Sequence, residues 1–173
     1  MYGLRIQLTF PHRARRAVVH SGKAVHFALT EVLMPVTATP RPKGHPGYSQ
    51  TMRRVPESAE AARRLVRTAL AAWGQEDLID DAALVITELV SNSVNHARLE
   101  SIRVVVTRPS EEFICLGVSD RTRSVPLLRT DSNGESTRGR GLLIVDALAE
   151  RWGTDLYRWG KQVWAEMKCE AAG

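Results

Sequence analysis

The chain has few cysteines, lacks a long apolar run and carries none of the best-known catalytic signatures. Its two cysteines, Cys115 and Cys169, do not make a disulfide framework, so we expect a reducing, cytoplasmic setting. No apolar segment approaches the roughly 20 residues of a membrane span, and no clean secretory signal opens the chain. The patterns GxSxG and HExxH are missing, which leaves esterase and metalloprotease chemistry unsupported. The phosphate-binding pattern GxxxxGK followed by Ser or Thr is also missing, and so is the HRD and DFG pair.

Positive charge is concentrated in the N-terminal third of the chain. Residues 1–54 hold nine Lys and Arg against one acid, whereas residues 55–173 hold 15 Lys and Arg against 18 acids. The net charge of +5 therefore describes a basic tail and gives nucleic-acid binding only weak support. We predict a basic, disordered extension over 1–50, with a Pro-rich linker at 35–47, and one folded domain over 51–170.

Hydrophobic periodicity predicts the elements of the folded domain. The predicted helices cover 59–73, with Ser58 as N-cap and Gly74 as stop, then 77–96 and 139–151, beside a weak helix at 14–33. The predicted strands cover 101–108, 111–120, 153–159 and 162–168, with the last turn at Gly160 and Lys161. This order is not the alternation of a doubly wound fold. It predicts an α+β two-layer sandwich, in which a mostly antiparallel sheet is covered on one face by about three helices.

The stretch ELVSNSVNHA, residues 88–97, places an acid and two carboxamides on one helix face. At about 100° per residue, Asn92 lies about 40° from Glu88, and Asn95 lies about 20° to the other side. Inward-facing polar groups need partners, because an unpaired buried polar group costs roughly 1–3 kcal/mol. A bound Mg²⁺ with phosphate oxygens would be such a partner. A solvated helix face explains the same pattern equally well.

Asp120 ends a predicted strand on its apolar face, because it alternates in step with Leu116 and Val118. A carboxylate on that face needs a hydrogen-bond donor, and the exocyclic amino group of adenine would serve. The alternative is structural: the carboxylate caps the following loop or pairs with Arg121 or Arg123.

The run Gly139-Arg140-Gly141-Leu142 opens the third predicted helix. Its two glycines let the backbone approach a ligand closely, and the helix start presents free N–H groups to an anion. Arg138 and Arg140 could add charge-assisted hydrogen bonds to phosphate. The alternative is an ordinary glycine-rich helix entry with solvated arginines.

These patterns, in this order, resemble those of the Bergerat-fold (GHKL, histidine-kinase-like) ATPases, and most closely the bacterial anti-sigma-factor serine/threonine kinases. ELVSNSVNHA resembles the N box, VSDRTRSVP the adenine-binding Asp motif, GRGLLIVDALAERWG the second glycine box and GKQVWAEM the closing hairpin strand. The resemblance covers about residues 50–168. It implies ATP and Mg²⁺ as cofactors and γ-phosphoryl transfer to a Ser or Thr of a STAS-type anti-anti-sigma protein. It also implies a sigma factor as a partner and a homodimer.

The resemblance implies a role for each candidate residue. Glu88 would be the general base toward the attacking hydroxyl, and Asn92 would ligate Mg²⁺ between the phosphates. Asp120 would accept a hydrogen bond from the adenine amino group. The phosphate site would be completed by Asn95, Gly139, Gly141 and the Leu142 amide.

One motif departs from the family pattern. The DxGxG sequence is replaced by Asp-Arg-Thr-Arg-Ser at 120–124, which changes the backbone path beside the adenine; a version with Pro126 occurs among close relatives. The irregular stretch 121–138 is either a lid over the site or a plain surface excursion. Two other functions stay open, namely a non-catalytic module that sequesters a sigma factor, and nucleic-acid binding through the basic tail.

Overall fold

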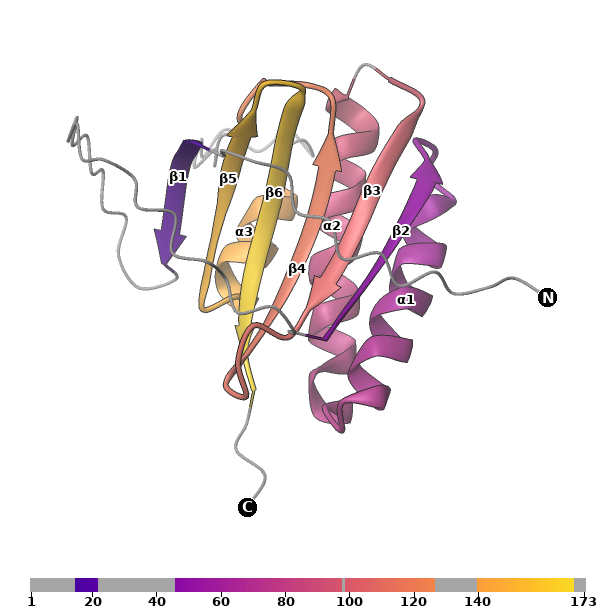
Figure 1. The fold of residues 1–173 in the computed structure, drawn as a ribbon, viewed down its shortest axis with the longest axis vertical. Coiled ribbons are helices and arrows are strands. Elements are labelled where there is room, and N and C mark those ends of the chain that lie inside the picture. Colours follow the sequence, from indigo (N-terminus) through magenta and orange to yellow (C-terminus); the bar gives the residue numbers. More distant parts are fainter. Residues whose placement is uncertain (1–14, 22–45, 98, 127–139, 170–173) are drawn as a thin grey trace.

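The described part of the chain forms an antiparallel sheet with α-helices on one of its faces (Figure 1). The structure is a computed structural model that describes residues 15–21, 46–97, 99–126 and 140–169. Six described strands follow the order β1-β5-β6-β4-β3-β2, and each of the five pairings between them is antiparallel. The strands are β1 Arg15–Ser21, β2 Gly47–Arg53, β3 Ser101–Thr107, β4 Phe113–Asp120, β5 Arg151–Tyr157 and β6 Gly160–Lys168.

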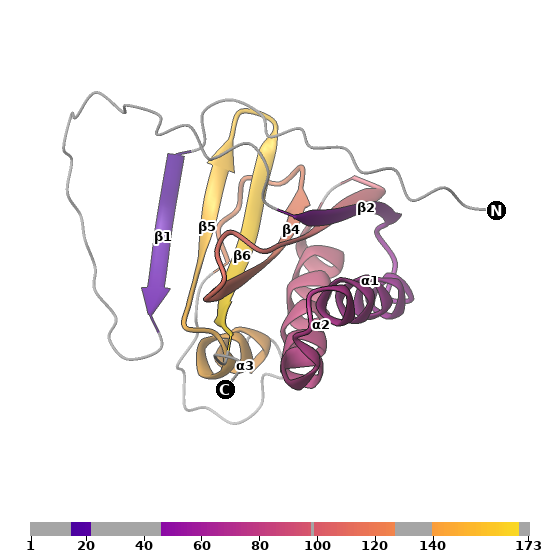
Figure 2. The ribbon, with the colours of Figure 1, turned by 60° about the horizontal axis from the view of Figure 1, so that its bottom comes forward.

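The described helices all lie on the same side of the sheet (Figure 2). They are α1 Ser58–Ala72, the short 3-10 turn η1 Glu76–Leu78, α2 Ile79–His96 and α3 Arg140–Leu148. This arrangement confirms the predicted α+β two-layer sandwich. The prediction allowed for a mixed sheet, whereas every pairing that the structure describes is antiparallel.

The core lies between the sheet and the helices, and it follows the predicted alternation of the strands. Inward positions of β3 and β4 are at most 1% exposed, and they are Ile102, Val104, Val106, Ile114, Leu116 and Val118. The facing side of α2 contributes Val85, Ile86, Leu89 and Val90, which are also fully buried. Burial of each large apolar side chain contributes about 1.5–3 kcal/mol, so the core holds α2 firmly against β4.

The two ends of α1 differ in how well the sequence predicted them. Gly74 follows the helix with φ 65°, a left-handed conformation that glycine adopts without strain, which confirms the predicted stop. Ser58, predicted as the N-cap, is instead the first helical residue. Its Oγ donates a hydrogen bond backward to the Arg53 carbonyl at 2.6 Å, and Glu57 in the cap position makes no side-chain cap bond.

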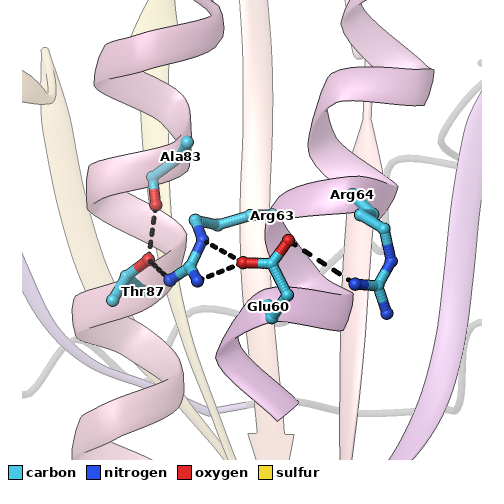
Figure 3. Close-up of polar contacts among 5 residues, drawn as sticks. All are labelled: Glu60, Arg63, Arg64, Ala83 and Thr87. Carbon is cyan, nitrogen blue, oxygen red and sulfur yellow. Dashed lines mark hydrogen bonds and ion pairs between the residues drawn. The ribbon is translucent and has the colours of Figure 1, made fainter. Parts of the chain in front are cut away.

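A polar contact joins α1 to α2 on the outer side of the helix pair (Figure 3). The Arg63 guanidinium binds the Glu60 carboxylate within α1 and donates to Thr87 Oγ1 on α2 at 3.3 Å. Thr87 donates in turn to the Ala83 carbonyl at 2.7 Å. The hydrogen bond from Arg63 lowers the pKa of Glu60 below its ordinary value. Thr87 directly precedes Glu88 in the chain, so this contact lies close to the predicted acid.

Two further predictions are wrong for the described residues. A weak helix was predicted at 14–33, but residues 15–21 form β1, which pairs with β5 at the edge of the sheet; the rest of that predicted helix lies outside the described residues. The last turn lies at residues 158–159 instead of Gly160 and Lys161, because β6 already begins at Gly160. The predicted division between extension and domain at residue 50 stays a prediction, and β2 runs across it.

Candidate functional site

Glu88 and Asn92 lie one turn apart on α2, and both are half-buried. Here α2 packs against both α3 and β4, and the half-burial of the two residues shows that they do not lie on a fully solvated helix face. The Asn92 Nδ2 atom is buried and has no hydrogen-bond partner among the residues that the structure describes. A buried amide without a partner costs about 1–3 kcal/mol, so a ligand acceptor such as a phosphate oxygen would be favoured here.

Gly141, in the first turn of α3, lies directly against Glu88. A Cβ atom added at Gly141 would come within 2.2 Å of Glu88 Oε2 and 3.2 Å of Glu88 Cδ. The space that any other residue would fill is therefore occupied by the Glu88 carboxylate. The acid predicted as general base and the glycine predicted at the phosphate site are therefore neighbours, and their roles stay predictions.

Asp120 is buried at the end of β4, with the whole residue only 2% exposed. Its Oδ1 accepts a hydrogen bond from the Thr122 backbone N–H at 2.8 Å and forms an ion pair with Lys161 Nζ at 3.0 Å. Its Oδ2 accepts from Ser93 Oγ at 3.0 Å. The carboxylate thus joins α2, β4 and β6 at one point.

Lys161 is the cross-strand neighbour of Asp120 in the β4–β6 pair and is 1% exposed. Its Nζ also donates to the Thr122 carbonyl at 3.4 Å. The close approach of the two strands requires Gly160, because an added Cβ there would lie 2.0 Å from the Asp120 carbonyl oxygen. A buried ion pair of this kind is costly to break, since removal of one member leaves an uncompensated charge.

The other predicted residues have different placements. Asn95 is exposed in the last turn of α2, and Leu142 packs its side chain into the core, which leaves only its amide for a ligand. Arg140 begins α3, although its side chain lies outside the described residues, as do Arg138 and Gly139. The predicted lid likewise falls mostly outside the described residues.

Sequence reasoning placed Asp120 correctly on the core face but missed its partners. The loop-capping alternative is found in part, as the Thr122 N–H bond shows. The alternative of pairing with Arg121 or Arg123 is wrong, because both arginines are exposed and the ion pair goes to Lys161. A signal for Lys161 existed: continuing the strand alternation back from the apolar positions of β6 puts it on the core face.

Ser93 was also missed as part of the site. It is 1% exposed on the apolar side of α2 and is one residue beyond Asn92. A serine at an otherwise apolar helix position signals a polar partner, and the partner is the Asp120 carboxylate 27 residues away.

Metal ligation by side chains alone has no support in the described part of the chain. No group of three or more His, Cys, Asp or Glu side chains that could hold a metal ion occurs there. Asn92 would thus act with ligand oxygens, which matches the preference of Mg²⁺ for one or two protein ligands beside phosphates. Within the same residues, no helix is long and apolar enough to cross a membrane.

The chain belongs to the histidine kinase-like ATPase domain family, whose model matches residues 52–166. That match spans more than half of the chain and contains every described residue of the site. The fold and the family agree, and the chain therefore carries an ATP-binding domain of the GHKL type. No curated protein matches the chain.

The described residues fit a bound nucleotide. The orphaned Asn92 amide, the glycine at the start of α3 and the buried Asp120 carboxylate offer a donor, a close approach to a helix N-terminus and an acceptor. These are the groups that a triphosphate and an adenine base would need.

Proposed function

We propose that this protein is a serine/threonine kinase and anti-sigma regulator, which transfers the γ-phosphate of Mg-ATP to a Ser or Thr of a STAS-type anti-anti-sigma protein. The observation that carries the proposal is the contact of the Glu88 carboxylate with the first turn of α3, one helical turn from the unpartnered Asn92 amide. An acid beside a phosphate-binding helix start can accept the proton of an attacking hydroxyl. A cytoplasmic location and a homodimer belong to the same proposal.

Each residue has a defined task in this proposal. Mg-ATP would supply the γ-phosphoryl group when bound; Asn92 would ligate the Mg²⁺, and Asn95 would contact the phosphates. Gly139, Gly141 and the Leu142 amide line the helix start, and Arg138 with Arg140 adds positive charge. Asp120 receives the adenine amino group. Glu88 orients the hydroxyl of the partner's Ser or Thr and takes up its proton.

The test is calorimetric titration of the full chain with ATP, with and without Mg²⁺. We expect micromolar binding, about −8 kcal/mol. Glu88→Ala should keep that affinity but lower transfer to the partner by about 10²–10⁴-fold, the usual contribution of a general base. Asn92→Ala should weaken binding and remove its dependence on Mg²⁺. A folded wild-type protein that binds no ATP, or a Glu88→Ala variant that transfers normally, would contradict the proposal.

A second candidate function is a non-catalytic module that sequesters a sigma factor. The observation that favours it is the Asp120 carboxylate, which has three protein donors of its own. In this second function the nucleotide is a conformational ligand or is absent, and no phosphate is transferred, so the two functions differ in a transfer assay with Mg-ATP. Partner binding that is unchanged by saturating ATP would favour the module.

A further inference from the structure

Between Gly141 and Leu148, α3 carries a single polar side chain, that of Asp146. Its Oδ1 accepts a hydrogen bond at 2.8 Å from the indole Nε1–H of Trp152, the second residue of β5. Trp152 is 1% exposed and belongs to the close-packed core, so the donor is held in place by its surroundings. The bond therefore joins α3 to the sheet through a directed contact.

Asp146 and Gly141 lie on different sides of α3. At about 100° per residue, they are about 140° apart around the helix axis, and the buried residues Leu142 and Val145 lie between them. The Gly141 side faces Glu88 on α2, and the Asp146 side faces β5. The helix is therefore held at both edges of its buried face.

The bond of Asp146 can fix the rotation of α3 about its own axis. Apolar packing is non-directional, whereas a hydrogen bond weakens steeply as its angle departs from linearity. A rotated α3 would point the backbone N–H groups of its first turn in another direction, and these are the groups that a phosphate would contact. The rotation would also change the space that Gly141 leaves for the Glu88 carboxylate.

We propose that Asp146 is a positioning residue of the nucleotide site: through Trp152 it fixes the rotation of α3 and so directs the first-turn N–H groups toward the phosphates of ATP. The inference rests on the proposed function, in which Gly141 and the Leu142 amide line the phosphate site. Asp146 lies about 7.5 Å farther along the helix axis than Gly141, at about 1.5 Å per residue. It therefore acts through α3 and not by contact with the ligand.

The experiment is calorimetric titration of the full chain with Mg-ATP. We expect Asp146→Ala to weaken binding by about tenfold, near the lower end of what one hydrogen bond to a charged group contributes. Asp146→Asn keeps an acceptor oxygen for the indole and should bind within about twofold of wild type. Glu150→Ala, which removes an exposed acid directly after α3, is the matched control and should leave the affinity unchanged.

A readout at the backbone separates positioning from a general loss of stability. The NMR amide signals of Gly141 and Leu142 should shift in Asp146→Ala protein and return to their wild-type positions in Asp146→Asn protein. Gly74→Ala strains the backbone after α1 and lowers stability there, so it should keep the wild-type affinity for ATP. An affinity that falls equally in Gly74→Ala protein would reveal an effect of stability alone and would overturn the inference.

A double-mutant cycle with Trp152→Phe tests the same bond from its other side. Trp152→Phe removes the donor, keeps a buried aromatic ring and should cause a similar loss of affinity. The double variant should lose about tenfold, no more than either single variant, because the bond is already broken in each. It leaves no unpaired indole N–H, so it provides the test if a single variant fails to fold.

The outcomes separate this inference from the proposed function. Additive losses in the cycle, or an Asp146→Ala variant that binds ATP as wild type does, would overturn the inference and leave the proposed function standing. Folded wild-type protein that binds no ATP would overturn the proposed function and this inference with it.

Discussion

At the start of α3, Gly141 leaves the space that the Glu88 carboxylate occupies. The nearest atom to a Cβ at this position is Glu88 Oε2, at the flexible end of the side chain, while Glu88 Cβ stays 3.5 Å away. A methyl group at Gly141 would therefore rotate the carboxylate without displacing α2. Gly141 therefore affects the position of the Glu88 carboxylate more than it affects the stability of the fold.

We predict that Gly141→Ala lowers phosphotransfer by about 100-fold, the lower end of what a misplaced general base costs. The melting temperature should not fall, because Ala is favoured over Gly within a helix by about 1 kcal/mol. The measurement pairs a transfer assay with thermal unfolding.

The control for Gly141→Ala is a double-mutant cycle with Glu88→Ala. If the methyl group acts only through the carboxylate, it adds no further loss in the Glu88→Ala background. Leu143→Ala, on the exposed side of α3, should leave transfer unchanged. A loss that is the same with or without Glu88 would contradict the steric account.

At the scale of elements, the end of α1 depends on one backbone conformation. Gly74 has φ 65°, and no atom lies within 4 Å of a Cβ placed there, so a substitution meets strain and no collision. We predict that Gly74→Ala lowers the free energy of unfolding by about 1–2 kcal/mol, the cost of a left-handed conformation for an L-residue. Urea denaturation with an unchanged m-value would measure this loss.

Gly74→Asn is the matched variant, because Asn adopts the left-handed conformation more readily than Ala does. It should lose less stability than Gly74→Ala. An Ala variant as stable as wild type would show that the turn relaxes to another conformation.

The elements that the sequence predicted well are those with a local pattern. The apolar spacing of α1 and α2 and the alternation of β3 and β4 lie within single segments, and the structure contains all four. β1 has no such pattern and is a strand because it pairs with β5, at least 130 residues later. The misplaced last turn hid Lys161 inside an expected loop, although strand alternation puts its side chain on the core face.

At the scale of the whole molecule, the described core and the site are built on elements other than β1. The described core side chains come from residues 52–169, and the site is built on α2, β4, α3 and β6. β1 contacts β5 at the outer edge of the sheet, on the far side of β6 from β4 (Figure 1).

We predict that a chain of residues 46–173 unfolds cooperatively and binds ATP within about threefold of the full chain, a difference of about 0.6 kcal/mol. The reason is that truncation removes an edge strand and leaves the described core intact. Urea denaturation and calorimetry would check the two statements. Aggregation of the shortened chain would show that β1 is needed to cover the β5 edge.

In the candidate site, as in the fold, local patterns predicted some residues and long-range contacts decided the others. Glu88 and Asn92 were predicted from helical spacing, and Asp120 from strand alternation, because each pattern is read within one element. Ser93 and Lys161 were not predicted as its partners, since they lie 27 and 41 residues from Asp120 in the chain. Their roles depend on how α2 and β6 are brought to the end of β4.

The amino-acid sequence by itself determined the α+β class, the main helices and strands, and the inward face of Asp120, because these follow from periodicity within short segments. Tertiary structure alone decided which donors meet that carboxylate, where the last turn falls, and that Gly141 lies against Glu88. These features depend on contacts between elements far apart in the chain. Such contacts are selected by packing of the whole core, which no local pattern encodes.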